Sequence, residues 1–269
     1  NIGLNVYQKA GDGYHEIDSV MSPIDLSDEM DITFYSEIGD LKISCSDKNI
    51  PTDERNILYK AYEIFFENSK KHKEKIEISL TKNIPSDAGF FLKLLNEHYG
   101  NVYNEKELEE LAMKVGSDVP FFIKNKTARV GGKGNKIELV ENNLKDSLIL
   151  VKPLGFGVST KDAYNSFDEL DEVRYANFEK IVECLRNDNR KDLEKYIENG
   201  LEQGISERNA DIKMFKAILN SVVPGKKFFM SGSGSTYYTF VTEIERSQIE
   251  TRLRTFVDNV KIIISKTIN

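Results

Sequence analysis

Hydrophobic residues recur along this chain with two spacings, and these predict both strands and helices. Strands are expected where β-branched and aromatic residues cluster or alternate with polar ones. Helices are expected where apolar residues fall at i, i+3, i+4 and i+7, as Ala88, Phe91, Leu92 and Leu95 do. The predicted order in the first half is strands 1–8, 15–24, 31–36 and 41–46, helix 56–70, strand 75–80, helices 86–99 and 104–115, and strands 127–131 and 136–140.

The polar stretch from Glu141 to Asp146 marks a domain boundary, which predicts domains at 1–145 and 146–269. Strands that alternate with helices in the second part indicate an α+β domain. The elements expected there are strand 147–152, four helical segments between about 160 and 221, strands 227–230 and 236–241, a helix from about 245, and strand 260–264.

Composition narrows the class of protein. The chain has 269 residues, of which 39% are hydrophobic and 30% charged, and its net charge is -7. An acidic protein repels a phosphate backbone, so nucleic acid is not expected as a partner. No run approaches the ~20 apolar residues of a membrane helix, and no signal peptide is visible. Cys45 and Cys184 lack the spacing of a zinc site, which favours a reducing compartment and predicts the cytoplasm. Because it opens without Met, inside a strand pattern, the chain is expected to be trimmed at its start.

Three segments carry candidate chemistry, and each has an ordinary structural alternative. The Gly-Ser-Gly-Ser sequence from Gly232 lets backbone N–H groups approach an anion, although a flexible hairpin turn has the same composition. Asp118 precedes apolar residues and could be a general base, or it could be an N-cap or turn aspartate that bonds its own backbone. Tyr14 and His15 could stack on a base and read its edge, or the segment from Asp12 could be only a hairpin turn followed by a core tyrosine.

In order and spacing, these segments resemble the family of 4-diphosphocytidyl-2-C-methyl-D-erythritol kinases within the GHMP superfamily of small-molecule kinases. Asp-Gly-Tyr-His from residue 12 with Gly-Ser-Asp-Val-Pro-Phe-Phe from residue 116 distinguishes this family from its relatives. The resemblance covers nearly the whole chain. It includes Asn-Ile-Gly-Leu-Asn-Val from residue 1, Arg-Asn-Ile-Leu from 55, Lys-Asn-Ile-Pro from 82, Lys-Pro from 152, Gly-Val-Ser-Thr from 157 and Met-Ser-Gly-Ser-Gly-Ser-Thr from 230.

The resemblance implies a two-domain GHMP kinase fold of the α+β class, with a ribosomal-protein-like N-terminal domain and a ferredoxin-like C-terminal domain. It implies that ATP, with Mg²⁺, phosphorylates the 2-hydroxyl of 4-diphosphocytidyl-2-C-methyl-D-erythritol in the methylerythritol phosphate route to isoprenoids. Asp118 would accept the proton of that hydroxyl. The family's catalytic lysine lies two residues before the position of Asn1, so it has no number here.

The resemblance also implies binding residues. Tyr14 and Tyr164 would stack on opposite faces of the cytosine, and His15 would read its edge. A core aromatic is the alternative for Tyr164, and an ordinary helix cap is the alternative for Asn56. The residues implied for the substrate are Asn1, Tyr14, His15 and Tyr164, and those implied for ATP are Asn56, Pro85, Ser86, Gly232 and Ser233.

One departure from the family affects ATP binding. The superfamily's phosphate loop runs from a proline through several glycines to Ser-Ser-Asp-Ala, whereas here Pro85 is followed directly by Ser86. Either the chain has lost this loop or the sequence omits a segment of the protein. The alternatives to the implied activity are therefore a different GHMP small-molecule kinase and a non-catalytic nucleotide-binding relative. The sequence does not give the oligomeric state.

Overall fold

The computed structural model describes residues 1–9, 11, 13–81 and 88–268. By internal contacts the chain divides into two compact units, residues 1–25 with 126–269 and residues 26–125. This division does not follow the predicted boundary after residue 145, because the strands of residues 128–139 join a sheet formed by the start of the chain. A division by contacts does not test a division into family domains, so domains 1–145 and 146–269 stay a prediction.

The first sheet of the larger unit has the order β1-β2-β6-β7, with all neighbours antiparallel. Strands β1 (Gly3–Lys9) and β2 (His15–Met21) form the predicted hairpin. Strands β6 (Ala128–Gly132) and β7 (Lys136–Leu139) pair around the predicted glycine-rich turn. The sheet therefore joins residues more than a hundred positions apart in the sequence.

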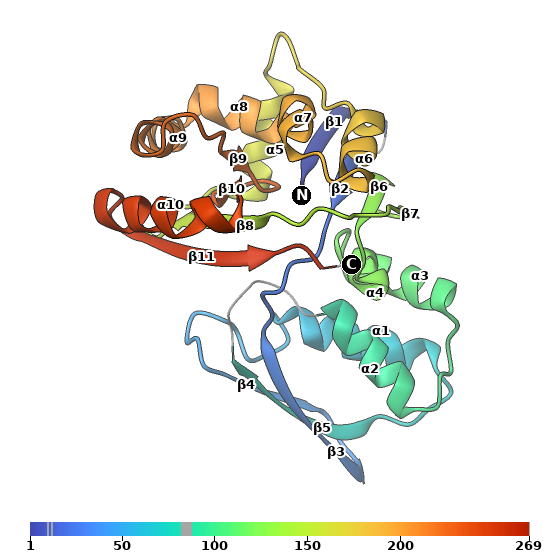
Figure 1. The fold of residues 1–269 in the computed structure, drawn as a ribbon. Coiled ribbons are helices and arrows are strands. Elements are labelled where there is room, and N and C mark those ends of the chain that lie inside the picture. Colours follow the sequence, from blue (N-terminus) through green and yellow to red (C-terminus); the bar gives the residue numbers. More distant parts are fainter. Residues whose placement is uncertain (10, 12, 82–87, 269) are drawn as a thin grey trace. The chain divides into compact units, whose positions relative to one another are not determined.

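The second sheet of this unit has the order β11-β8-β10-β9 and is also antiparallel. Strands β8 (Ser147–Pro153) and β10 (Tyr237–Val241) are its centre, and every residue of β10 is buried. Strands β9 (Phe229–Met230) and β11 (Val260–Lys266) flank them. Helix α10 (Glu243–Phe256) lies along β8 and β11 (Figure 1).

Five helices occupy residues 160–222, where four helical segments were predicted, and that count was wrong. An asparagine or serine whose side chain accepts a backbone hydrogen bond begins each of them, which explains their short, separate character. None of the helices in the described ranges is long and apolar enough to cross a membrane. The five are α5 (Thr160–Asp168), α6 (Phe178–Arg186), α7 (Arg190–Tyr196), α8 (Gly200–Arg208) and α9 (Ala210–Val222).

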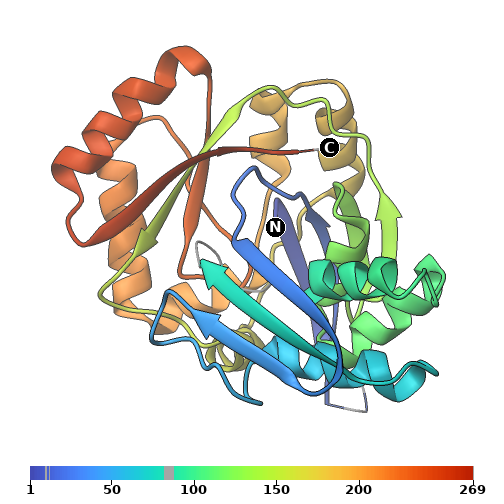
Figure 2. The same ribbon diagram turned by 90° about the horizontal axis from the view of Figure 1, so that it is seen from below.

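The smaller unit is a three-stranded sheet with helices packed on it. Figure 2 shows β3 (Glu29–Ile38), β5 (Glu74–Thr81) and β4 (Leu41–Cys45) side by side, in the order β3-β5-β4. The buried core between sheet and helices includes Phe65 and Phe91, which are fully enclosed. The helices are α1 (Ile57–Asn68), α2 (Ala88–His98), α3 (Glu105–Val115) and α4 (Val119–Lys124).

Two local predictions in this unit had opposite outcomes. The predicted capping box of α3 is confirmed, because Asn104 and Glu107 each bond the other's backbone N–H. The predicted helix-to-strand turn around Asp118 was wrong, because α4 begins at Val119. Pro120 sits in the first turn of that helix, where its missing N–H costs nothing.

Candidate active site

His15 lies at the start of β2, and three side chains of α5 converge on its imidazole ring. The ring of Tyr164 stacks on it with centroids 4.9 Å apart, and the edge of Phe167 approaches it at 5.9 Å. Asp168 Oδ1 lies 2.6 Å from His15 Nε2. Tyr164, Phe167 and Asp168 fall at i, i+3 and i+4 of one helix, so they share a face. This enclosure leaves the His15 side chain only 5% exposed.

Asp168 holds the imidazole through a charged hydrogen bond. Its second oxygen accepts from Lys9 Nζ at 2.6 Å. Burial alone would raise the pKa of the Asp168 carboxyl, but the hydrogen bonds from Lys9 and His15 outweigh it and lower the pKa below its ordinary value. The group therefore accepts as a carboxylate, so His15 Nε2 carries the proton and the ring orientation is fixed.

This lowered pKa predicts a pH-dependent contribution to stability. A carboxyl whose pKa is depressed by folding stabilises the protein above its unfolded pKa, and the contribution is lost as the pH falls through the folded pKa. Asp168→Asn is therefore expected to lower the free energy of unfolding more at about pH 7 than at about pH 3, because the contribution decreases once the pH falls below the ordinary carboxyl value of about 4. Urea unfolding of both proteins at the two pH values measures this difference. Asp171→Asn, at an exposed position three residues further along, is the control; an equal deficit at both pH values for Asp168→Asn would contradict the assignment.

Tyr14 projects from the turn that precedes β2. Its side chain is among the exposed large aromatic groups, at 67% exposure, and the Lys133 ammonium lies 5.0 Å from its ring centre. Contact between a cation and the face of an aromatic ring is favourable. The core alternative raised for this position therefore does not describe Tyr14, whereas Tyr164 is half-buried and packs against the core of this unit.

The turn of residues 231–235, which we call the glycine-serine turn, connects β9 to β10. It is closed by hydrogen bonds from Ser231 N–H to Thr236 O at 2.9 Å and from Gly234 N–H to Ser231 O at 3.0 Å. Gly232 and Gly234 have φ of 57° and 88°, which glycine adopts without strain. Within the described residues, the N–H groups of Gly232 and Ser233 donate to no acceptor. Such a turn presents backbone donors suited to an anion.

Two further side chains adjoin this turn. Asn1 Oδ1 is 3.1 Å from the position that a Cβ on Gly232 would take, and Asn1 Nδ2 donates to Ser19 Oγ at 2.8 Å. Thr160 Oγ1 lies 3.2 Å from Ser233 Oγ. Since Thr160 is the first residue of α5, this helix begins at the turn and ends at the His15 cluster.

Asp118 lies in the smaller unit, immediately before α4. Its side chain is exposed and makes no capping hydrogen bond, and its carboxylate has no hydrogen-bond partner among the residues that the structure describes. The turn-forming alternative requires the side chain to bond its own backbone, and this bond is missing from the described part of the chain.

The first turn of α2 packs against the start of α4. A Cβ on Gly89 would lie 2.9 Å from Val119 O and 2.6 Å from Phe122 Cβ, closer than real Cβ contacts come. Only glycine allows this approach. The residue after Asp118 therefore contacts the helix that follows the Pro85 and Ser86 segment.

The remaining residues predicted to bind ATP are Asn56, Pro85 and Ser86. Asn56 caps α1, because its Oδ1 accepts from Leu58 N–H at 3.0 Å and its Nδ2 donates to Pro51 O at 2.7 Å. Its side chain is buried, so the helix-cap role is present and an adenine contact stays a prediction. Pro85 and Ser86 lie outside the described residues.

Comparison with known proteins decides the family. A 4-diphosphocytidyl-2-C-methyl-D-erythritol kinase from Fusobacterium nucleatum is 76% identical, over all of this chain and 95% of that protein. The chain belongs to the 4-diphosphocytidyl-2-C-methyl-D-erythritol kinase family. A second relative with that name, from Clostridium beijerinckii, is 33% identical over 93% of this chain and 90% of its own length. No family model matches the chain.

Solved structures confirm the predicted GHMP kinase fold. A crystal structure of 4-(cytidine 5′-diphospho)-2C-methyl-D-erythritol kinase has a TM-score of 0.77 at 24% identity, and covers 98% of this chain and 96% of its own. Homoserine kinase from Cytophaga hutchinsonii has a TM-score of 0.68 at 17% identity and covers 98% of both chains. These two likenesses establish the architecture and leave the substrate to the sequence relatives.

The kinase from Fusobacterium nucleatum also differs from this chain in length. The alignment spans 278 residues, nine more than the 269 of this chain, so at least nine positions of that family member have no counterpart here.

Sequence reasoning missed the partners of His15. Asp168 and Lys9 belong to no motif, yet they fix His15. Asp168 stands four residues after Tyr164, and that helical spacing was the available signal. Nothing local in the sequence shows that Lys9 reaches the end of α5.

Proposed function

We propose that the protein transfers the γ-phosphoryl group of ATP to the 2-hydroxyl of 4-diphosphocytidyl-2-C-methyl-D-erythritol. Membership of the family supports the substrate. The observation that carries the chemistry is Asp118, an exposed carboxylate without a partner among the described residues, beside the first turn of α2. The family assignment favours this activity over another GHMP kinase or a non-catalytic relative.

Asp118 acts as the general base in this proposal. It accepts the proton of the attacking hydroxyl as the phosphorus–oxygen bond forms, and ADP leaves with the electrons of the broken bond. Phosphoryl transfer depends mainly on positioning and charge stabilisation, so one base at a helix start is sufficient. The N-terminus of α2, which Asp118 adjoins, favours a nearby triphosphate. The residues proposed for ATP are Asn56, Pro85, Ser86, Gly232 and Ser233.

The substrate's cytidine end is assigned to the larger unit. Tyr14 offers an exposed ring to one face of the base, and His15 with Tyr164 forms a rigid wall beside it. Asn1 adjoins the glycine-serine turn and is proposed to contact the same substrate.

Mg²⁺ is the proposed metal. Among the described residues no group of three or more His, Cys, Asp or Glu side chains is placed to hold an ion. Mg²⁺ keeps several waters and binds one or two carboxylates plus the phosphates of its nucleotide. When bound, the ion would neutralise the charge that develops on the phosphates.

Titration and product analysis test this function on the full-length protein with its natural sequence between Pro85 and Ser86. Calorimetry is expected to show MgATP binding, and mass spectrometry is expected to show one phosphoryl group added to the cytidine substrate. The same protein should leave mevalonate and homoserine unchanged, since neither has a base for Tyr14. If the glycine loop is present and no binding occurs at millimolar nucleotide, the kinase function fails.

A further inference from the structure

Asn199, the residue before α8, uses its whole side-chain amide. Its Oδ1 accepts from the N–H groups of Leu201 and Glu202 at 3.0 and 3.2 Å. Its Nδ2 donates to Met230 O at 2.8 Å and to Gly232 O at 2.9 Å. An amide has two acceptor and two donor positions, and here all four are filled at a residue that is 4% exposed. The oxygen caps α8 and the nitrogen holds the glycine-serine turn.

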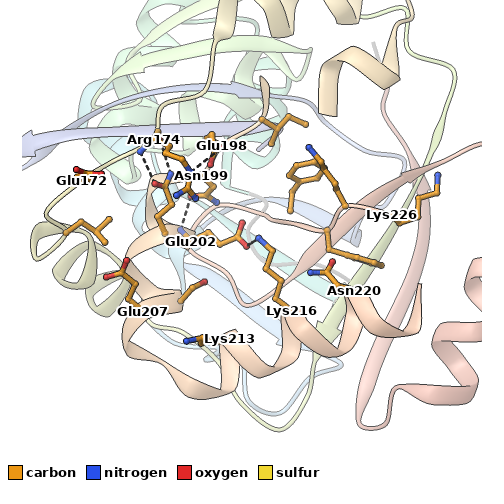
Figure 3. Close-up of a pocket in the computed structure, with 17 residues that line it drawn as sticks. Glu172, Arg174, Glu198, Asn199, Glu202, Glu207, Lys213, Lys216, Asn220 and Lys226 are labelled. Carbon is orange, nitrogen blue, oxygen red and sulfur yellow. Dashed lines mark hydrogen bonds and ion pairs between the residues drawn. The ribbon is translucent and has the colours of Figure 1, made fainter. Parts of the chain in front are cut away.

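Glu202, three residues after Asn199, contacts the residue that precedes the turn. Its Oε2 accepts from Met230 N–H at 3.1 Å, and its other oxygen pairs with the ammonium of Lys216 on α9. Figure 3 shows Glu202 and Lys216 pointing toward each other in a hollow of about 690 Å³ beside α8 and α9. Met230, the last residue of β9 before the turn, therefore has its N–H and its carbonyl fixed by two buried side chains.

The contact with Gly232 determines where the turn directs its donors. In a trans peptide unit the C=O and the following N–H point in opposite directions. Because Gly232 O faces Asn199, the N–H of Ser233 points away from α8. This N–H and that of Gly232 have no acceptor within the described residues. Asn199 thus holds the peptide in the orientation that leaves its donor available.

The identity of residue 199 is explained by this second contact. Ser, Thr or Asp would cap α8 as well as Asn does. Among these residues only asparagine also supplies two donors on the same side chain. A cap alone would not require it.

We propose that Asn199 is a positioning residue that aims the N–H group of Ser233 at a phosphate group. The inference rests on the proposed function, in which this turn contacts a phosphate. That phosphate belongs either to ATP or to the cytidine diphosphate moiety. Asn199 acts through the turn and touches neither ligand.

Asn199→Asp separates the two roles, because it keeps the acceptor that caps α8 and removes both donors. Asn209→Asp is the matched control, since Asn209 caps α9 through Ile212 N–H and has no contact with the turn. Calorimetry on the full-length protein gives the Kd of MgATP and the Kd of cytidine 5′-diphosphate. We expect one of the two to rise about tenfold in Asn199→Asp, because two buried hydrogen bonds to the turn are lost. The ligand that is affected identifies the phosphate.

The melting temperature of the Asn199→Asp variant distinguishes a positioning role of Asn199 from a purely structural one. A cap or packing defect would lower the melting temperature and leave both Kd values unchanged. Asn199→Ser, which caps without adding charge, provides the same comparison if the Asp variant does not fold. Both Kd values within twofold of the parent in a folded variant would overturn the inference alone. Failure of the parent to bind either ligand would overturn the proposed function, and the inference with it.

Discussion

Asp118→Asn is expected to lower kcat by about 10²- to 10⁴-fold, the usual contribution of general-base assistance. Asparagine has the size and hydrogen-bonding capacity of aspartate but cannot accept the hydroxyl proton. The Asp118 side chain makes no capping bond, so the change removes no structural contact of that kind. ATP binding should remain nearly unchanged, because the proposed triphosphate site consists of backbone N–H groups and a helix N-terminus. Steady-state kinetics and ATP titration of the same preparation measure the two quantities.

Asp211→Asn is the matched control for this experiment. Asp211 is an exposed aspartate in the first turn of α9, so its substitution reproduces the loss of charge at a helix start in the other unit. It should retain the parental kcat. A folded Asp118→Asn enzyme with more than about half of the normal kcat would remove Asp118 from the mechanism, because the lower bound of ~10²-fold leaves no room for so small an effect.

Tyr14→Ala is expected to weaken binding of the cytidine substrate by about 1–3 kcal/mol, the range for one base–aromatic stack. In Kd this is roughly 5- to 150-fold. Because the Tyr14 side chain is 67% exposed, its removal should leave the melting temperature unchanged. Calorimetric titration with cytidine 5′-diphosphate provides the Kd.

Tyr175→Ala tests whether the effect is specific to the base. Tyr175 is another tyrosine of the same unit and is 52% exposed, but its ring stacks on Tyr7 instead. Its substitution should leave the Kd for the cytidine ligand close to the parental value. If Tyr14→Ala binds as tightly as the parent, or if the two variants lose the same affinity, Tyr14 does not stack on the cytosine.

The spacing of hydrophobic residues along the chain was sufficient to predict most of the helices and strands. The alternation from Asn1 to Gln8 and the apolar spacing of α2 correspond to elements that the structure contains. Helix α4 was missed because six residues are too few to show a helical period, and Pro120 resembles a turn signal. The helices after α5 were undercounted because each is short. Their separating asparagines, Asn189 and Asn199 among them, were legible as caps but also occur in loops.

The candidate site was harder to predict, because it depends on contacts between residues that lie far apart in the sequence. The motif residues His15 and Tyr164 were named from sequence, and the structure stacks their rings. Asp168 and Asn199 were not named, because their roles arise from contacts across 153 and 31 positions of sequence. The approach of Gly89 to Val119 is likewise a packing result, and it is what places Asp118 beside α2. No local period encodes such contacts.

Helix α5 behaves as a molecular ruler. Its first residue, Thr160, meets Ser233 in the glycine-serine turn, and its last, Asp168, meets His15. At 1.5 Å per residue, the eight steps between them span about 12 Å, and the four steps to Tyr164 span about 6 Å. A helix is stiff over such a length, so a ligand group at the turn and a ring at His15 are held at a set separation. A molecule whose anion and base are separated by a different distance could contact the glycine-serine turn or His15, but not both.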